Sequence, residues 1–446
     1  MSYNKYANIN RTRFFGGVCA IFMTSSSFAL NLFDDGNTRV DAKLEIWMGA
    51  MHSQQSYMQS GTLTEGSREW MEGYTEYGLS GIQKLAEEGS SLYGAMSGLT
   101  SGTFGDGDPA GFTNGTERKS DWEELYLGWR SGDFFPGLGV DGLDISFGSQ
   151  KIIVGDGFVI AGDQLNFGHE ILDGQLNRGG GYYMGVRRSF DRTGIIRIGG
   201  SEGWRGDLMW LASDNPAQAK PEMAVATLEH VSPKGTVGLT YIDIVDIDDK
   251  LSFLYPDRKG TKVYSVRGQG NAGIDSLSLA GHYVLQNKEH GASESAWYLE
   301  AGWTLASFPW APTLSYRYSY FSDKYDHLFY GYVHGPGTWF LGEVSGNFAG
   351  PFNTNSRVNQ LSITANPGER LSVGAVFYKH APVDTSLGDL GGKEMDIYAL
   401  WRVTDYATII PLVGIYDPDA SYSEGGSQIG NDKYNLYTAL VLGFSF

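Results

Sequence analysis

The chain has little cysteine, proline and charge for its length of 446 residues. It holds one Cys and 14 Pro, and charged residues make up 19% of it, below the quarter that is usual in soluble domains. No run of about 18 apolar residues follows the N-terminal segment, which excludes transmembrane helices. No helical stripe is long enough to predict a soluble helical domain.

The sequence also lacks the short motifs of common enzymes and metal sites. It contains no P-loop, no HExxH pair and no GxSxG elbow, so we expect no enzyme activity, no cofactor and no metal ion. Two acidic stretches, "GDGD" at 105–108 and "YDPD" at 416–419, do not follow the EF-hand pattern, and Ca²⁺ binding there stays open. The formal net charge of −18 disfavours nucleic acid as a partner.

The first 29 residues are typical of a secretory signal peptide. Three cations precede a short apolar core, and Ser27-Phe28-Ala29 has the small-x-small form of a cleavage site. Cleavage after Ala29 would leave a mature domain at 30–446 without cysteine, and therefore without a disulfide framework. Loss of the three cations would take the net charge from −18 to about −21.

Alternation with a period of two recurs along the mature chain. In "TRVDAKLEIWMG" at 38–49, Val40, Leu44 and Met48 share one face, while Asp41 and Lys43 share the other. The last residues, "YNLYTALVLGFSF", alternate in the same way up to a terminal Phe. Such a pattern predicts strands with one apolar face, in a soluble sandwich or in a membrane barrel.

The connections between these strands separate the two alternatives. Eight short turns alternate with nine longer polar segments, which favours a transmembrane antiparallel β-barrel with short periplasmic turns and long extracellular loops. Eighteen strands follow from this count if "IIRIGG" is a strand and "TWFLGEVSGN" is a loop; sixteen strands is the alternative. We therefore expect a single barrel domain at 30–446 in the outer membrane of a Gram-negative bacterium, in contact with lipid and lipopolysaccharide.

Aromatic residues gather near the predicted strand ends, as in the interfacial girdle of a barrel, and they include Tyr182, Tyr183, Trp204, Trp303 and Trp401. The sequence predicts this place for most of them, whereas Tyr298 and Tyr437 have inward parity. The final strand resembles the signal that the outer-membrane assembly machinery reads, so that machinery is an expected partner. It must also pair with the first strand, because lipid tolerates no open sheet edge.

Parity also predicts which charges face the lumen, because a charge on the lipid face is costly. The third long loop, 155–192, adds an excess of arginine that would favour anions if the loop entered the lumen, or would bind lipopolysaccharide phosphates if it stayed outside. Structural ion pairs within the wall are the alternative role for the strand charges. The candidate pore-lining residues are Arg39, Lys43, Arg187, Arg188, Arg192, Arg197, Arg205, Arg267 and Arg317.

Several stretches resemble the alginate-export family of outer-membrane proteins. They include "EELYLGWRSG", "LDISFGSQKIIVGDGFVI", "RGDLMWLASD", "GTVGLTYI", "GTWFLGEVSG", "NPGERLSVGAVFYKH" and "KEMDIYALW". The resemblance implies an 18-stranded barrel with an arginine-rich constriction that passes a polyuronate outward. The arginines at the matching places are Arg187, Arg188, Arg192, Arg197 and Arg205.

The sequence thus predicts a passive outer-membrane channel for hydrophilic, anionic solutes, such as a polyuronate or organic acids. Two alternatives stay open: an outer-membrane hydrolase with a Ser/His/acid cluster at one rim, and a non-conducting structural or adhesin barrel with a filled lumen. A passive pore works in both directions, so uptake as a general or specific porin is as compatible with the sequence as export. The sequence does not determine the oligomeric state.

Overall fold

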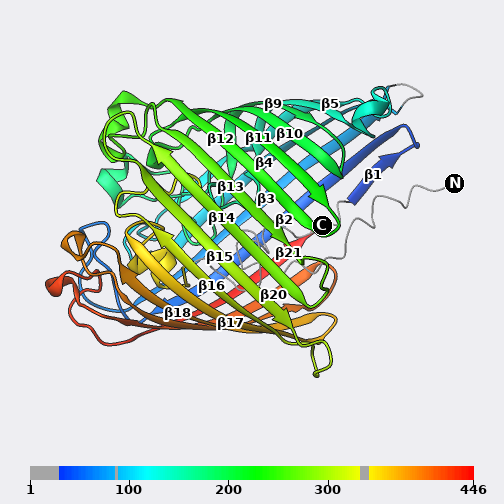
Figure 1. Ribbon diagram of the computed structural model, residues 1–446. Helices are drawn as coiled ribbons and strands as arrows, with labels where there is room; N and C mark the ends of the chain where they lie inside the picture. Colours follow the sequence, from blue (N-terminus) through cyan, green and yellow to red (C-terminus); the bar gives the residue numbers. More distant parts are fainter. Residues whose placement is uncertain (1–29, 86–88, 332–340) are drawn as a thin grey trace.

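The computed structural model describes residues 30–85, 89–331 and 341–446, and it forms one closed antiparallel barrel (Figure 1). Each strand of the barrel wall pairs with its neighbour in the sequence, and the last strand, β21 (Asn435–Ser445), pairs with β2 (Thr38–Ser53). That closing register runs from Glu45 opposite Ser445 to Ser53 opposite Tyr437. The predicted barrel is confirmed, with 18 strands and not 16.

The strands of the barrel wall are mostly 9 to 17 residues long, enough to cross a membrane with a tilt. The first part of the wall consists of β2 (Thr38–Ser53), β3 (Arg68–Lys84), β4 (Ser91–Gly105), β5 (Arg118–Arg130), β6 (Leu143–Lys151), β9 (Ser189–Ile198), β10 (Gly203–Ala212), β11 (Glu222–Ser232) and β12 (Gly235–Asp246). The second part consists of β13 (Lys262–Gly270), β14 (Leu277–Asn287), β15 (Glu294–Thr304), β16 (Thr313–Phe321), β17 (Ser356–Gly368), β18 (Leu371–Pro382), β19 (Gly392–Arg402), β20 (Ala407–Pro418) and β21 (Asn435–Ser445).

Helices in the described residues are short and lie in the connections. They are η1 (Pro136–Leu138), η2 (Ile171–Gly174), η3 (Pro216–Gln218), η4 (Asp249–Leu254), η5 (Ser345–Ala349), η6 (Thr385–Leu387) and η7 (Tyr422–Glu424). Within the part of the chain that the structure describes, none of them has the length and apolar character needed to span a membrane.

Eight connections on one side of the barrel alternate with nine on the other, as predicted. The nine are mostly the longer ones, although 288–293 has only six residues and 131–142, on the opposite side, has twelve. "IIRIGG" contributes to β9 and so to the wall. The described part of "TWFLGEVSGN", from Leu341 on, lies in the long connection between β16 and β17. By the rule that outer-membrane barrels have short periplasmic turns, the long connections are extracellular.

Alternate residues of each strand face lipid and lumen. On β10, Leu208 faces outward and is 56% exposed, whereas Leu211 faces inward and is fully buried. Trp204, Trp303 and Trp401 lie on the outer face, as expected for an aromatic girdle. The girdle prediction is wrong for Tyr182 and Tyr183, because both belong to a loop inside the barrel and not to a strand end.

A short additional strand, β1 (Leu30–Asp34), pairs with β2 where β21 has already ended. Its register places Leu30 opposite Ala42 and Asp34 opposite Arg39, while the backbone of Phe446 bonds Leu44. β21 and β1 therefore pair with successive segments of the same edge of β2. The predicted signal peptide, 1–29, lies outside the described residues.

Candidate functional site

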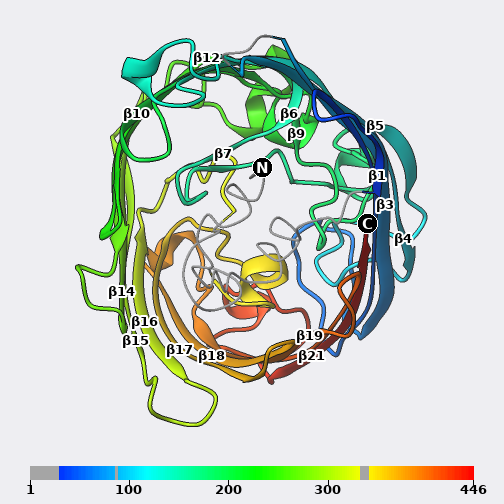
Figure 2. The same cartoon turned by 90° about the vertical axis from the view of Figure 1, so that its right-hand side faces the viewer.

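The third long connection, residues 152–188, enters the barrel from the extracellular side (Figure 2). Two short strands near its start, β7 (Ile153–Val154) and β8 (Ile160–Ala161), pair with each other. Asp156, between them, reaches the inner face of the wall: its carboxylate accepts a hydrogen bond from the Tyr298 hydroxyl (2.5 Å) and lies 2.9 Å from Nδ1 of His282. Tyr298 is an inward, buried residue, as its parity predicted.

The end of the same connection contacts another part of the wall. The backbone N–H of Met184 donates to Glu72 on β3 at 3.3 Å, and the ring of Tyr183 lies 6.3 Å from that of Tyr437 on β21. Because Asp156 contacts β14 and β15, the loop crosses the lumen between two separate regions of the barrel. The question that the sequence left open, lumen or surface, is answered in favour of the lumen.

The seventh long connection, 322–355, also turns inward in its described part. Its helix η5 contacts β19, where the backbone N–H groups of Val344 and Ser345 donate to the Glu394 carboxylate at 2.6 and 2.9 Å. Phe348 packs edge-on against Trp70 of β3, with ring centroids 5.7 Å apart. The two inward loops therefore narrow the lumen from opposite sides (Figure 2).

Carboxylates pair with the predicted cations of the wall. Glu229 on β11 lies between Arg205, at 2.7 Å, and Arg267, to which it is also hydrogen bonded. Arg317 is buried against Glu300 on the neighbouring strand at 3.2 Å. The other pairs are Arg39 with Asp41 at 2.7 Å, Lys43 with Glu76 at 2.9 Å and Arg197 with Asp144 at 3.8 Å.

The arginines of the third loop hold that loop in place. Arg178 bonds Asp163 within the loop and Asp214 of the fourth long connection, at 3.2 and 2.9 Å. Arg187 bonds Asp214 as well, at 3.1 Å, and Asp121 on β5 at 3.3 Å. Burial raises the pKa of Asp163. Burial also acts to raise the pKa of Asp214, but Arg178 and Arg187 outweigh it and lower that pKa.

Two further arginines, Arg188 and Arg192, were predicted to line the pore, but their surroundings differ from that prediction. The guanidinium of Arg188 is buried and donates to the backbone oxygens of Gly185 and Met184 at 2.8 and 3.1 Å. Arg192 belongs to β9 and not to the loop, and it has the outward parity of Ile196. Its side chain is 72% exposed and lies 3.4 Å from Glu222 at the extracellular rim, so its assignment to the lumen was wrong.

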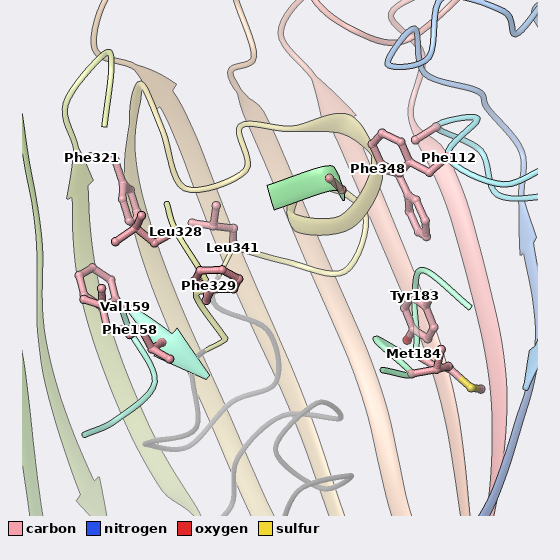
Figure 3. Close-up of a cluster of buried hydrophobic side chains, with 14 of the residues drawn as sticks. Phe112, Phe158, Val159, Tyr183, Met184, Phe321, Leu328, Phe329, Leu341 and Phe348 are labelled. Atoms are coloured by element: carbon pink, nitrogen blue, oxygen red, sulfur yellow. The ribbon is translucent and has the colours of Figure 1, made fainter. Parts of the chain in front are cut away.

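Sequence reasoning missed a cavity of about 300 Å³ between the inward loops. Figure 3 shows Phe112 and Tyr183 on one side of this region, and Leu328, Phe329 and Leu341 on the other. Aromatic and amide side chains from six long connections line the cavity. They include Gln59, Phe112, Gln164, Phe167, Tyr182, Gln218, Tyr255, Asn347, Phe352 and Asn353.

Among the described residues, Ser345, His380 and Glu394 have the side-chain types of a serine-hydrolase triad but not its hydrogen-bond arrangement. Oγ of Ser345 lies 3.1 Å from Nε2 of His380 and 2.5 Å from Glu394. In a Ser-His-acid triad, the carboxylate orients the histidine through Nδ1. Here it bonds the serine instead, and Nδ1 of His380 finds no partner among the described residues. Nor do the described residues contain a group of acids, histidines or cysteines suited to a metal ion.

A closed 18-stranded barrel with an apolar outer face and a charged inner face is the architecture of an outer-membrane β-barrel protein, which confirms the predicted localisation.

The comparisons agree with that class. No protein-family model matches the chain, and no curated protein matches it. Similar solved structures include OccK11 (OpdR) of Pseudomonas aeruginosa, with a TM-score of 0.53, 11% identity and coverage of 91% of this chain and 96% of that one. The BenF-like porin of Pseudomonas fluorescens Pf-5 has a TM-score of 0.58 at 10% identity, covering 91% and 98%. Acinetobacter baumannii OccAB4 has a TM-score of 0.55 at 8% identity, again covering 91% and 98%. Identities this low establish a shared fold and nothing finer.

Proposed function

We propose that this protein is an outer-membrane channel through which small hydrophilic solutes diffuse passively. The observation that carries the proposal is the inner wall, where inward-facing charged side chains remain accessible to solvent. Arg205, for example, is paired with Glu229 and still has 43% of its side chain exposed. A charged row accessible to water inside a closed barrel lines an aqueous path.

The anion preference expected from the sequence depended on cations without partners. The predicted pore-lining cations that face the lumen instead have carboxylate partners or, for Arg188, backbone oxygens, so we expect them to contribute only a weak net field. We therefore propose weak charge selectivity, and small solutes in place of a polyuronate. A relation to the alginate-export proteins thus receives little support from the site. The neighbours of similar fold include proteins named as porins, which supports a channel without naming its solute.

The experiment is single-channel recording of the refolded chain 30–446 in a planar bilayer, with a KCl gradient. We expect open steps and a reversal potential close to zero. Arg205→Ala should shift that potential toward cation preference, because Glu229 loses one of its two partners. Arg370→Ala, at an exposed turn beside Asp405, is the matched control. Strong anion selectivity would restore the sequence-based prediction.

A barrel that does not conduct is the second candidate, and a specific observation favours it. The two inward loops pack against each other through Ile160 and Phe329, whose backbones form a bridge. If the refolded chain gave no current under any voltage, the structural or adhesin alternative would replace the channel. We also propose that the assembly machinery binds the C-terminal strand and that lipopolysaccharide phosphates bind Arg192.

A further inference from the structure

The cavity between the inward loops differs in charge from the rest of the lumen. Neither a carboxylate nor a lysine or arginine is among the described residues that line it, although the chain has a net charge of −18. Among these described residues the one histidine is His327, whose pKa is lowered to about 4 by burial, so it is neutral at pH 7. A charged solute would lose hydration there without meeting an opposite charge, which is unfavourable.

Flat apolar surfaces dominate the lining. Phe112 stacks on Phe167 with ring centroids 4.8 Å apart, and Tyr182 lies 4.5 Å from Phe112. These contacts fix the rings before any ligand arrives. Phe167 and Tyr182 are only partly buried, so they offer ring surface to a ligand. Such a platform binds a ligand that has a flat apolar face.

Amide groups supply the polar part of the lining. Gln59 and Gln218 donate to backbone oxygens of Ala349 and Leu328, at 3.1 and 3.0 Å, which fixes their orientation. Asn353 is 2% exposed, and its Oδ1 finds no donor within the part of the chain that the structure describes. A buried acceptor without a donor is unfavourable by about 1–3 kcal/mol, so a ligand hydroxyl that donates to it would bind favourably.

We propose that this cavity binds an uncharged sugar of mono- or disaccharide size. The C–H face of a pyranose would stack on the Phe167–Tyr182 platform, and a hydroxyl would donate to Oδ1 of Asn353. The volume of about 300 Å³ is at the small end of ligand sites and fits a molecule of this size. The inference rests on the proposed channel, since it names the solute class that would pause between the inward loops.

The experiment is isothermal titration calorimetry of the refolded chain in a detergent without a sugar headgroup. Maltose, glucuronate and phenol are the three probes. We expect saturable binding of maltose, with glucuronate and phenol weaker by at least about tenfold, since one carries a charge and the other lacks the sugar face. Equal binding of glucuronate, or binding of phenol without maltose, would overturn the proposal.

Two variants test the named contacts. Asn353→Ala removes the acceptor, and Phe167→Leu keeps an apolar side chain but removes the flat ring. Each should weaken maltose binding by about tenfold or more, the loss expected for one polar or stacking contact. Asn37→Ala, in the exposed turn between β1 and β2, is the control. Unchanged maltose affinity in Phe167→Leu, which does not depend on Asn353, would contradict the stacking mode.

Conductance separates this inference from the proposed function. A channel that conducts KCl but does not bind maltose would refute the sugar site alone. A protein that binds maltose in the calorimeter but never opens in the bilayer would keep the site and refute the channel.

Discussion

Arg178 lies almost fully enclosed in the third long loop, between Asp163 and Asp214. Arg178→Met leaves Asp163 buried without its cation, a change that costs roughly 3–5 kcal/mol for a buried pair. We therefore expect amide hydrogen exchange in residues 160–188 to accelerate by at least about 100-fold and up to several thousand-fold, measured by mass spectrometry on the refolded barrel. The wall strands should keep their protection. Arg192→Met, on the outer rim, is the matched control, and equal exchange in both variants would refute the anchoring role.

Asp108 lies in the second long connection and is completely buried. Burial raises its pKa from 3.8 to about 6, although its carboxylate accepts hydrogen bonds from Ala110, Phe112 and Thr113. Because the folded pKa exceeds the unfolded one, the contribution of Asp108 to stability falls as the pH rises from about 4 to about 6 and stays constant above that. A carboxyl titration by NMR should show a midpoint near 6 that disappears in Asp108→Asn. A midpoint near 4 would contradict this.

The sequence predicted the parity of single residues well but not their partners. Arg205, Arg267 and Arg317 face the lumen because each alternates with apolar neighbours that face lipid. Their carboxylate partners lie on other strands, adjacent for Arg205 and Arg317 and two strands away for Arg267, at 17 to 38 positions in the chain. No local pattern therefore showed that the charges were balanced. Arg192 was misplaced because its strand begins at Ser189, inside the range assigned to the loop.

At the scale of an element, two carboxylates of β19 hold the seventh loop: Asp396 accepts the backbone N–H of Glu343 at 3.1 Å, and Glu394 accepts more of the loop's donors. Glu394 on β19 accepts the backbone N–H groups of Val344 and Ser345, and also the Ser345 hydroxyl. Glu394→Ala leaves the two backbone N–H groups without an acceptor, at about 1–3 kcal/mol for each, whereas the Ser345 hydroxyl can still donate to the backbone oxygen of Leu341. The loop should then leave the lumen part of the time, and single-channel records should show larger and more variable open steps.

The control for that variant is Glu369→Ala, at the exposed turn between β17 and β18. It should leave the records as they are. An unaltered conductance in Glu394→Ala would show that packing of Phe348 against Trp70 holds the loop without the carboxylate.

Strands and turns could be predicted from the sequence, but the paths of the loops could not. A transmembrane strand can be recognised from about ten consecutive residues, because its apolar lipid-facing and polar lumen-facing side chains alternate. The third loop takes its path from contacts such as Asp156 with His282, which are 126 positions apart. The lining of the cavity likewise comes from six connections, and the sequence of each one by itself is that of an ordinary polar loop.

At the scale of the whole molecule, stability depends on keeping charge inside the barrel and apolar groups outside. Leu239 lies in the middle of β12 and faces outward, whereas Ile198 faces outward at the turn end of β9. Leu239→Arg places a cation on the lipid face near the bilayer centre, where it costs roughly 2–4 kcal/mol, while Ile198→Arg lies near the interface and should cost about 0–1 kcal/mol. Reversible unfolding in lipid vesicles measures both free energies. Equal losses would mean that the membrane does not surround the barrel at the level of Leu239, and the assignment of the lipid-facing band would then have to move along the strands.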